Sequence, residues 1–196
     1  MGLLGLGNPT RSHDRSEGPT YDGPMSAVDW VKLELHLGNV RYDEPLRLPE
    51  RMSITTLAVL GDTSANRRRI YQLNKACSAD IPGRGQFFSY EEYAQRRFAG
   101  LGFRPDGQVL LLDGDAMVGL CALSLAPGRD WAFIEMTGIL RPYRRRGLAT
   151  DVKRYAIEQA RTWGATTIRT VNHPTNRPII DANRKLGFHE ADFDLG

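Results

Sequence analysis

The residues from Arg144 to Ala149 have the composition of a turn that binds an anion. An apolar stretch is followed by Pro142, three consecutive arginines and Gly147, and an amphipathic pattern begins at Leu148. The first backbone N–H groups of a helix lack partners within the helix, and the helix dipole is positive there. Arginine also pairs well with phosphate. The stretch therefore predicts a pyrophosphate site at a helix start, with an ordinary connection carrying solvated arginines as the alternative.

A second group of polar residues follows the next apolar stretch. Asn172, Pro174 and Asn176 come directly after the β-branched residues 166–171, and the sequence NRKLGF occupies residues 183–188. We expect the strand 166–171 to lie beside the strand that leads into the arginine turn. The polar group would then lie at the end of that strand, next to the anion site.

Hydrophobic periodicity predicts the elements that position these residues. Residues 31–37 alternate between apolar and polar and predict a half-buried strand, and Ser89 with Glu92 forms a capping box that opens a helix. The remaining order is a strand over 53–59, a helix over 66–78, a helix from Ser89 to Phe98, strands over 108–112, 117–125 and 132–140 with a turn at Asp113-Gly114, a helix over 148–163, a strand over 166–171 and a helix over 176–186.

The composition describes one folded domain with an appendage. The chain has 196 residues, of which 41% are hydrophobic and 25% charged, which is typical of a globular protein. We expect a disordered tail over 1–24, because it is polar and aperiodic, an extra strand and linker over 25–52, and the main domain over 53–196. The extra strand is either a remnant of a preceding domain or a replacement for a short C-terminal strand.

Several classes of protein are not expected. No stretch of 18 apolar residues or export signal is present, so we expect a cytoplasmic protein with no membrane contact. Cys77 and Cys121 each lie in an apolar pattern and are expected to be reduced and buried, and the histidines lack metal-ligand spacing, so no metal is expected. Arginine accounts for 22 of the 26 basic residues, but without a broad basic face interleaved with aromatics we expect no nucleic-acid partner.

The sequence resembles the Gcn5-related N-acetyltransferases (GNAT) over about residues 53–190. The resemblance rests on the R-x-x-G-x-A pattern from Arg144 to Ala149, preceded by a strand and Pro142, and on Asn176 followed by N-x-K-L-G-F. It extends to the second domain of tandem GNAT proteins through SADIP at residues 78–82. It implies an α/β (α+β) fold with a mixed, mostly antiparallel twisted sheet, flanked by helices, in which a splayed central strand pair holds CoA.

The resemblance also implies a set of donor-binding residues and an acyl donor, acetyl-CoA. The pyrophosphate would lie on the N–H groups from about Arg145 to Thr150, and the pantetheine against the end of the preceding strand. Asn176 and Asn183 would contact the pantetheine or the sulfur. The implied cofactor-binding set is Ile139, Leu140, Arg144, Arg145, Arg146, Gly147, Leu148, Ala149, Thr150, Asn176 and Asn183.

The predicted reaction is direct acetyl transfer to a primary amine of a small molecule or peptide, by a monomer or homodimer. An ammonium group cannot attack a thioester, so a base is useful. Glu135 is the predicted base. The alternatives are that Glu135 has a purely structural role, or that Glu91, Glu92 or Asp80 is the base. A main-chain N–H near Ile139 would stabilise the oxyanion. Candidate acceptor-site residues are Asp80, Phe87, Phe88, Tyr90 and Trp131.

One departure from the family pattern favours an alternative. The family commonly has a tyrosine general acid seven positions after the asparagine that matches Asn176, and this chain has Asn183 there. A CoA-binding regulatory module without turnover is therefore the alternative function.

Overall fold

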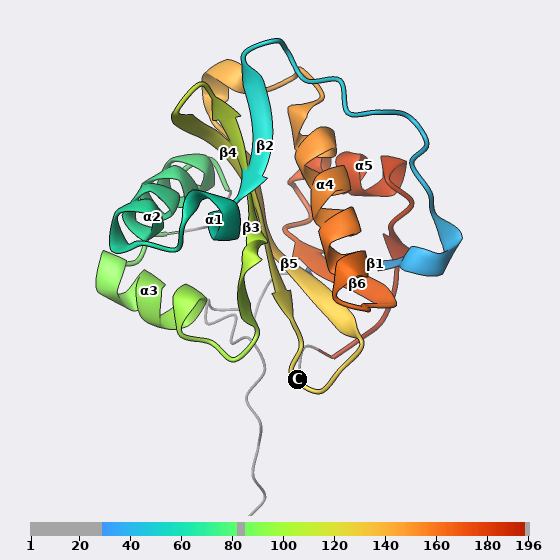
Figure 1. The fold of residues 1–196 in the computed structure, drawn as a ribbon. Coiled ribbons are helices and arrows are strands. Elements are labelled where there is room, and N and C mark those ends of the chain that lie inside the picture. Colours follow the sequence, from blue (N-terminus) through green and yellow to red (C-terminus); the bar gives the residue numbers. More distant parts are fainter. Residues whose placement is uncertain (1–28, 82–84, 195–196) are drawn as a thin grey trace, which may run out of the picture.

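One seven-stranded sheet runs through the protein (Figure 1). The computed structural model describes residues 29–81 and 85–194, and the tail expected over 1–24 lies outside them. The strands are β1 (Val31–His36), β2 (Met52–Thr56), β3 (Phe103–Asp113), β4 (Ala116–Leu125), β5 (Trp131–Ile139), β6 (Thr167–Asn172) and β7 (His189–Glu190). Their order across the sheet is β2-β3-β4-β5-β6-β1-β7.

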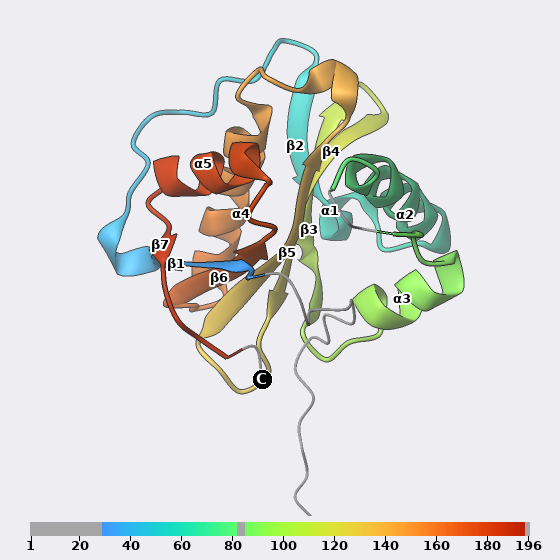
Figure 2. The same ribbon diagram turned by 180° about the vertical axis from the view of Figure 1, so that it is seen from behind.

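Helices cover both faces of this sheet. They are η1 (Leu37–Asn39), α1 (Leu57–Leu60), α2 (Ser64–Ser78), α3 (Tyr90–Phe98), η2 (Arg141–Tyr143), α4 (Leu148–Thr162) and α5 (Arg177–Lys185). The helices α1, α2 and α3 lie on one side and α4 and α5 on the other, as the two opposite views show (Figures 1 and 2). No helix in the described ranges is long and apolar enough to cross a membrane.

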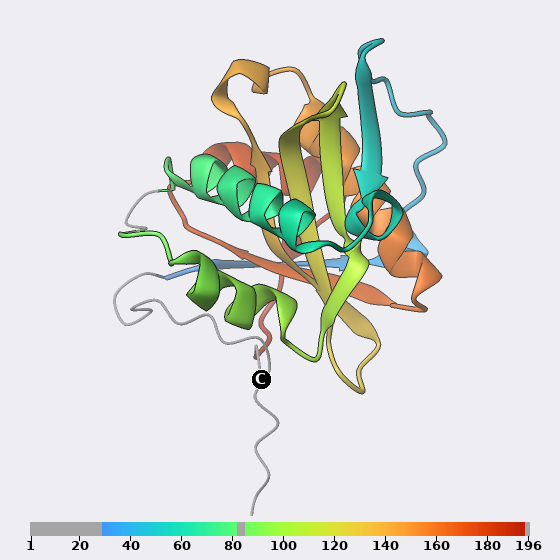
Figure 3. The ribbon, with the colours of Figure 1, turned by 60° about the vertical axis from the view of Figure 1, so that its left-hand side comes forward.

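Only one pair of neighbouring strands is parallel. The strands β5 and β6 run in the same direction, and every other registered pair is antiparallel. The mixed, mostly antiparallel sheet flanked by helices that the sequence predicts is therefore confirmed. Figure 3 shows α2 crossing in front of the central strands, so each face of the sheet has its own core.

The N-terminal strand is an internal strand of the sheet. Its alternation places Leu33 and Leu35 in the core at 0% and 1% exposure. Val31 to His36 pair with β6 on one side, and Leu33 and Glu34 pair with the short β7 on the other. β1 thus supplies the strand next to β6 that the two-residue β7 is too short to supply.

Several local predictions differ in their boundaries, and β3 begins at Phe103, five residues before the expected strand over 108–112. The strand expected over 53–59 ends at Thr56, because the Thr56 hydroxyl accepts a hydrogen bond from the N–H of Val59 and caps the short helix α1. The turn between β3 and β4 lies at Gly114 and Asp115, one residue later than expected. The capping box of Ser89 and Glu92 is confirmed at the start of α3.

The close packing of α2 on β5 depends on Gly138. A Cβ atom at this position would lie 2.5 Å from Cys77 Cβ and 3.0 Å from Cys77 Sγ. Both distances are too short for carbon and sulfur atoms that belong to a packed helix. The helix can approach the strand this closely only because residue 138 has no side chain.

We predict that Gly138→Ala lowers the free energy of unfolding by about 1–3 kcal/mol, since α2 must shift away from β5. Urea denaturation followed by circular dichroism measures the change. Gly38→Ala is the matched control, because a Cβ atom there meets no atom within 4 Å. Equal stability of the two variants would show that the contact with Cys77 is not limiting.

Candidate functional site

The turn between β5 and α4 presents backbone N–H groups to solvent. Arg145 has a φ of 61° and Gly147 a φ of 78°, so the chain twice enters the left-handed region before the helix begins. The carbonyl of Gly147 accepts hydrogen bonds from the N–H groups of Thr150 and Asp151. Among the described residues no acceptor is found for the amides of 145–149, and such a run of amides at a helix start is suited to an anion.

Arg144 anchors this turn to the rest of the protein. Its Nε donates to the carbonyl oxygen of Ile139 at 2.7 Å, and its Nη1 donates to Asp80 at 2.7 Å. Arg141 pairs with the same carboxylate through its Nε at 2.9 Å. The two guanidinium groups hold the pKa of Asp80 well below its usual range. Asp80 follows α2, so the ion pairs fasten the turn to the opposite layer of helices.

The strands β5 and β6 separate next to this turn. Their parallel register covers three pairs, from Trp131 with Thr167 to Phe133 with Arg169. Beyond them the hydroxyl of Thr170 donates to the carbonyl of Ile134 at 3.1 Å. From residue 134 onward, the edge of β5 that faces β6 has no registered strand partner within the described chain.

A β-bulge lies at the point of separation. Leu123 of β4 pairs with Ile134, and the residue before it, Ala122, pairs with Met136. Glu135 is therefore the extra residue of β5. Bulges redirect side chains and are common beside active sites.

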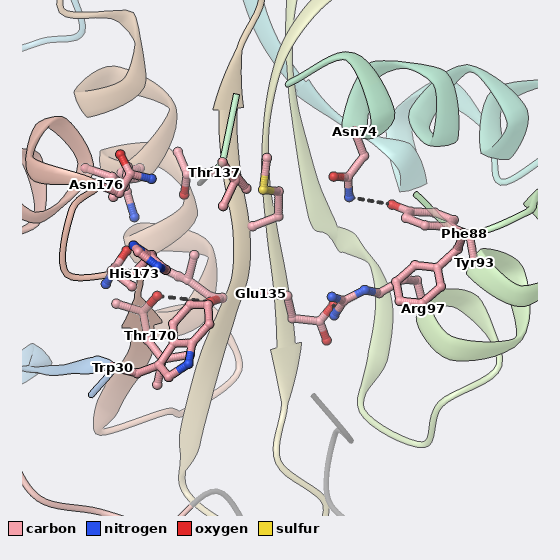
Figure 4. Close-up of a pocket in the computed structure, with 17 residues that line it drawn as sticks. Trp30, Asn74, Phe88, Tyr93, Arg97, Glu135, Thr137, Thr170, His173 and Asn176 are labelled. Carbon is pink, nitrogen blue, oxygen red and sulfur yellow. Dashed lines mark hydrogen bonds and ion pairs between the residues drawn. The ribbon is translucent and has the colours of Figure 1, made fainter. Parts of the chain in front are cut away.

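The separated strands line a cavity of about 70 Å³. Figure 4 shows Asn176, His173 and Thr170 on one side of it, Asn74, Tyr93 and Arg97 on the other, and Glu135 between them. Lys153 of α4 and Asn172 at the end of β6 also line this cavity. Asn74 Nδ2 donates to the phenol oxygen of Tyr93 at 2.8 Å across α2 and α3.

Glu135 lies between two hollows. It lines the cavity, and it also lines a groove of about 730 Å³ formed by α3, the start of β3 and the end of β4, together with Trp131. Its Oε2 accepts a hydrogen bond from Arg97 Nη1 at 2.6 Å, and the Glu135 side chain is only 12% exposed. A molecule in the groove and one in the cavity can therefore approach the same carboxylate from opposite sides.

The residues that the sequence predicts for the site lie at several different places in the structure. Glu135, Asn176 and His173 line the cavity, and Trp131 lines the groove. Asn183 is fully buried and is not among the residues that line the cavity. Asp80 pairs with the turn, as described above.

Two of the three remaining aromatic candidates pack into the helical layer. Phe87 and Tyr90 both contact the ring of Tyr71, with ring centroids 5.7 and 5.5 Å apart. Tyr90 also lies under the guanidinium of Arg68, 4.1 Å from its ring centroid. Phe88, the neighbour of Phe87, is the aromatic residue of this segment that lines the cavity.

Sequence reasoning missed Arg97 and Lys153. Arg97 gives no local signal, because its partner Glu135 is 38 residues away. Lys153 does give one: it has Ile157 and Ala160 at positions +4 and +7, so a lysine occupies the apolar face of an amphipathic helix. The buried face of α4 contains both Val152 and Lys153.

A group of metal-ligating side chains lies at the sheet edge, away from the cavity. Ligand atoms of Glu34, His36 and His189 lie within 4.8 Å of one another. Arg169 Nε donates to Glu34 at 2.7 Å. The guanidinium already supplies the positive charge that this carboxylate needs and would repel a cation, so we assign no metal there. Cys77 and Cys121 are free and buried, as predicted.

Comparison with known proteins identifies the family. The sequence model described as "Acetyltransferase (GNAT) family" matches residues 68–188, which include most of α2, the bulged strand β5, the arginine turn and α5. The chain belongs to this family. A comparison with curated proteins found no match.

Solved structures share the fold. A GCN5-related N-acetyltransferase from Sphaerobacter thermophilus is 18% identical with a TM-score of 0.60, over 83% of this chain and 48% of its own. A tandem GNAT protein from the clavulanic acid biosynthesis pathway is 20% identical with a TM-score of 0.60, over 85% of this chain and 52% of its own. The chain thus spans about half the length of these two proteins.

A third structure contains a CoA derivative. AAC(6')-Iy, in complex with the bisubstrate analog CoA-S-monomethyl-acetylneamine, is 16% identical with a TM-score of 0.52, over 73% of this chain and 94% of its own. At these identities the three structures establish the fold, a mixed sheet flanked by helices.

We predict that Asp80→Asn speeds hydrogen exchange several-fold at pH 7 at the hydrogen-bonded amides of the turn, Tyr143, Arg144 and Thr150, because Arg141 and Arg144 lose their ionic partner. Exchange followed by mass spectrometry measures the rate. The depressed pKa of Asp80 means that the pairing stabilises the turn above about pH 4 and weakens as the pH falls further.

Asp62→Asn is the control. Asp62, like Asp80, forms an ion pair with arginine, in this case Arg67, but it lies before α2 and away from the turn. If the two variants exchange equally fast in 141–150, Asp80 does not anchor the turn.

Proposed function

We propose that the chain binds acetyl-CoA and transfers the acetyl group directly to a primary amine of a small molecule or peptide. The observation that carries this proposal is the position of the amides of 145–149 at the start of α4, beside the unpaired edge of β5. The family match supports the choice of donor.

The pyrophosphate of CoA suits the turn at the start of α4. Backbone N–H groups and the positive end of the helix dipole stabilise a diphosphate. The side chains of Arg145 and Arg146 are exposed and can pair with phosphate oxygens. Arg144 plays a different part in this proposal: it holds the turn in place through Asp80 and Ile139.

The pantetheine arm suits the separated strands. Buried backbone N–H and C=O groups need hydrogen-bond partners, and the edge of β5 from Ile134 onward has lost those of β6. The arm carries two amide groups, so it can supply both donors and acceptors along this edge. Its thioester end would then reach the bulge at Glu135.

Glu135 is the base in this proposal. An amine in the groove beside Trp131 can give up a proton to Glu135, directly or through a water, and attack the thioester carbonyl with its lone pair. Protonation of Glu135 removes the negative charge that faces Arg97, so the guanidinium can stabilise the negative charge that develops on the thioester carbonyl. The thiolate is a good leaving group because an ordinary thiol pKa is about 8.5.

A second candidate function is CoA binding without turnover. It is favoured by Asn183, which takes the position of the family's usual tyrosine and is buried away from the cavity lining. Turnover measurements on the intact protein distinguish the two functions, since both require CoA binding.

We predict that CoA binds to the wild-type protein and that Ala149→Glu weakens its affinity by at least about ten-fold, because the new carboxylate repels the diphosphate at the helix start. Isothermal calorimetry measures both affinities. Ala58→Glu, on the exposed side of α1, is the control and is expected to bind like wild type. No binding by the wild-type protein would refute the donor site.

We predict that Glu135→Gln lowers kcat/KM by about 10²- to 10⁴-fold while CoA affinity stays the same, because the proton acceptor is lost and the diphosphate site at the start of α4 is unchanged. A thiol-release assay with acetyl-CoA over polyamines, aminoglycosides, amino acids and peptides finds the acceptor and then measures the rate. Glu158→Gln, an exposed glutamate on α4, is the control. An unchanged rate across pH would remove Glu135 from the mechanism.

A further inference from the structure

Lys153 is a buried lysine whose amine has no hydrogen-bond partner among residues 29–81 and 85–194. The residue is 0% exposed, and no acceptor is found for Nζ. It lies on the face of α4 that packs on the sheet, and Nζ is 5.8 Å from the ring centroid of Phe188. Burial lowers the pKa of its amine below the usual range of lysine.

This arrangement is costly for the ligand-free protein. Removing a polar group from water costs free energy unless a hydrogen bond compensates for the lost hydration, and the amine of Lys153 has the ring of Phe188 near it but no acceptor within the described residues. Its neighbours on α4 are Val152, Ala156 and Ile157, all at 0% exposure, so an apolar side chain of similar length would suit the position better. The packing of the helix therefore does not account for a lysine here.

The cavity is the space in which a partner for this amine could bind. Lys153 lines the cavity, and so does Asn172 at the end of β6, whose Nδ2 is also buried without an acceptor. Two residues from different elements, each with a donor that lacks an acceptor, thus line the space between β5 and β6. A ligand that satisfies both groups must carry oxygen acceptors, and an amide or thioester carbonyl supplies them.

We propose that Lys153 is a ligand-binding residue that, together with Asn172, donates hydrogen bonds to carbonyl oxygens of the acyl-pantetheine arm of the donor. This rests on the proposed function, which places the arm between β5 and β6. It assigns to Lys153 a role separate from the diphosphate contacts at the start of α4, because the lysine contributes to the cavity and the turn does not.

Two measurements on Lys153→Met test the proposal. Methionine preserves the length of the side chain and removes the donor. Without ligand, the thermal midpoint should rise by about 2–4 °C, because an unpaired buried amine is removed. CoA affinity should fall about ten-fold, since hydrogen bonds in an enclosed site are lost. A residue that serves only packing would not produce opposite changes in stability and affinity.

ADP is the probe that separates this site from the diphosphate site. It carries a diphosphate and no pantetheine, so its affinity should be equal in wild type and Lys153→Met. Lys153→Gln keeps an N–H donor and should recover part of the CoA affinity. Lys185→Met, at an exposed lysine of α5, is the control and should change neither stability nor binding.

The outcomes are distinguishable. If CoA and ADP bind wild type and Lys153→Met equally well, the role of Lys153 is wrong and the donor site remains. If Lys153→Met weakens ADP and CoA alike, the lysine acts through the turn and the proposal is also wrong. If neither probe binds the wild-type protein, the proposed function and this inference fail together.

Discussion

The separation of β5 from β6 is the constraint on which the rest of the site depends. Parallel pairing stops at Phe133, and the bulge at Glu135 bends β5 away from its neighbour. A sheet tolerates such a gap only if other groups satisfy the exposed backbone. Thr170 satisfies the carbonyl of Ile134, and the remaining edge borders a cavity lined by polar side chains.

Both layers of helices contact the region where β5 and β6 separate. From one face, α2 packs against Gly138 through Cys77, and Asp80 just beyond α2 binds Arg144 of the turn. From the other face, α4 begins at the turn and contributes Lys153 to the lining of the cavity. The turn, the bulge and the cavity therefore lie in one contiguous region that both layers of helices contact.

Two of the described buried polar groups that lack a partner line the cavity, one on α4 and one at the end of β6. Within the described residues, Lys153 Nζ and Asn172 Nδ2 are buried without a hydrogen-bond partner, and Arg145 has a backbone conformation that is unfavourable for a side chain. Proteins retain such locally unfavourable features mainly where function requires them. Here the features surround the gap between β5 and β6, which is the place where a ligand would compensate for them.

The sequence by itself determined the features that depend on neighbouring residues. The capping box of Ser89 and Glu92, the alternation of β1, the turn that ends in Gly147 and the helix that follows it are all local patterns, and the structure contains each of them. They arise from hydrogen bonds and side-chain spacing within a few residues, so one segment is enough to predict them.

Tertiary structure alone decided the contacts between distant segments. Arg97 meets Glu135 because α3 packs beside the bulge of β5, Asp80 meets Arg144 across 64 residues, and β1 lies between β6 and β7. Burial of the Lys153 amine likewise depends on Phe188 and on the closing of α4 over the sheet. These partners are chosen by how whole elements pack, and no local pattern encodes that choice, because the interacting groups become neighbours only after the chain has folded.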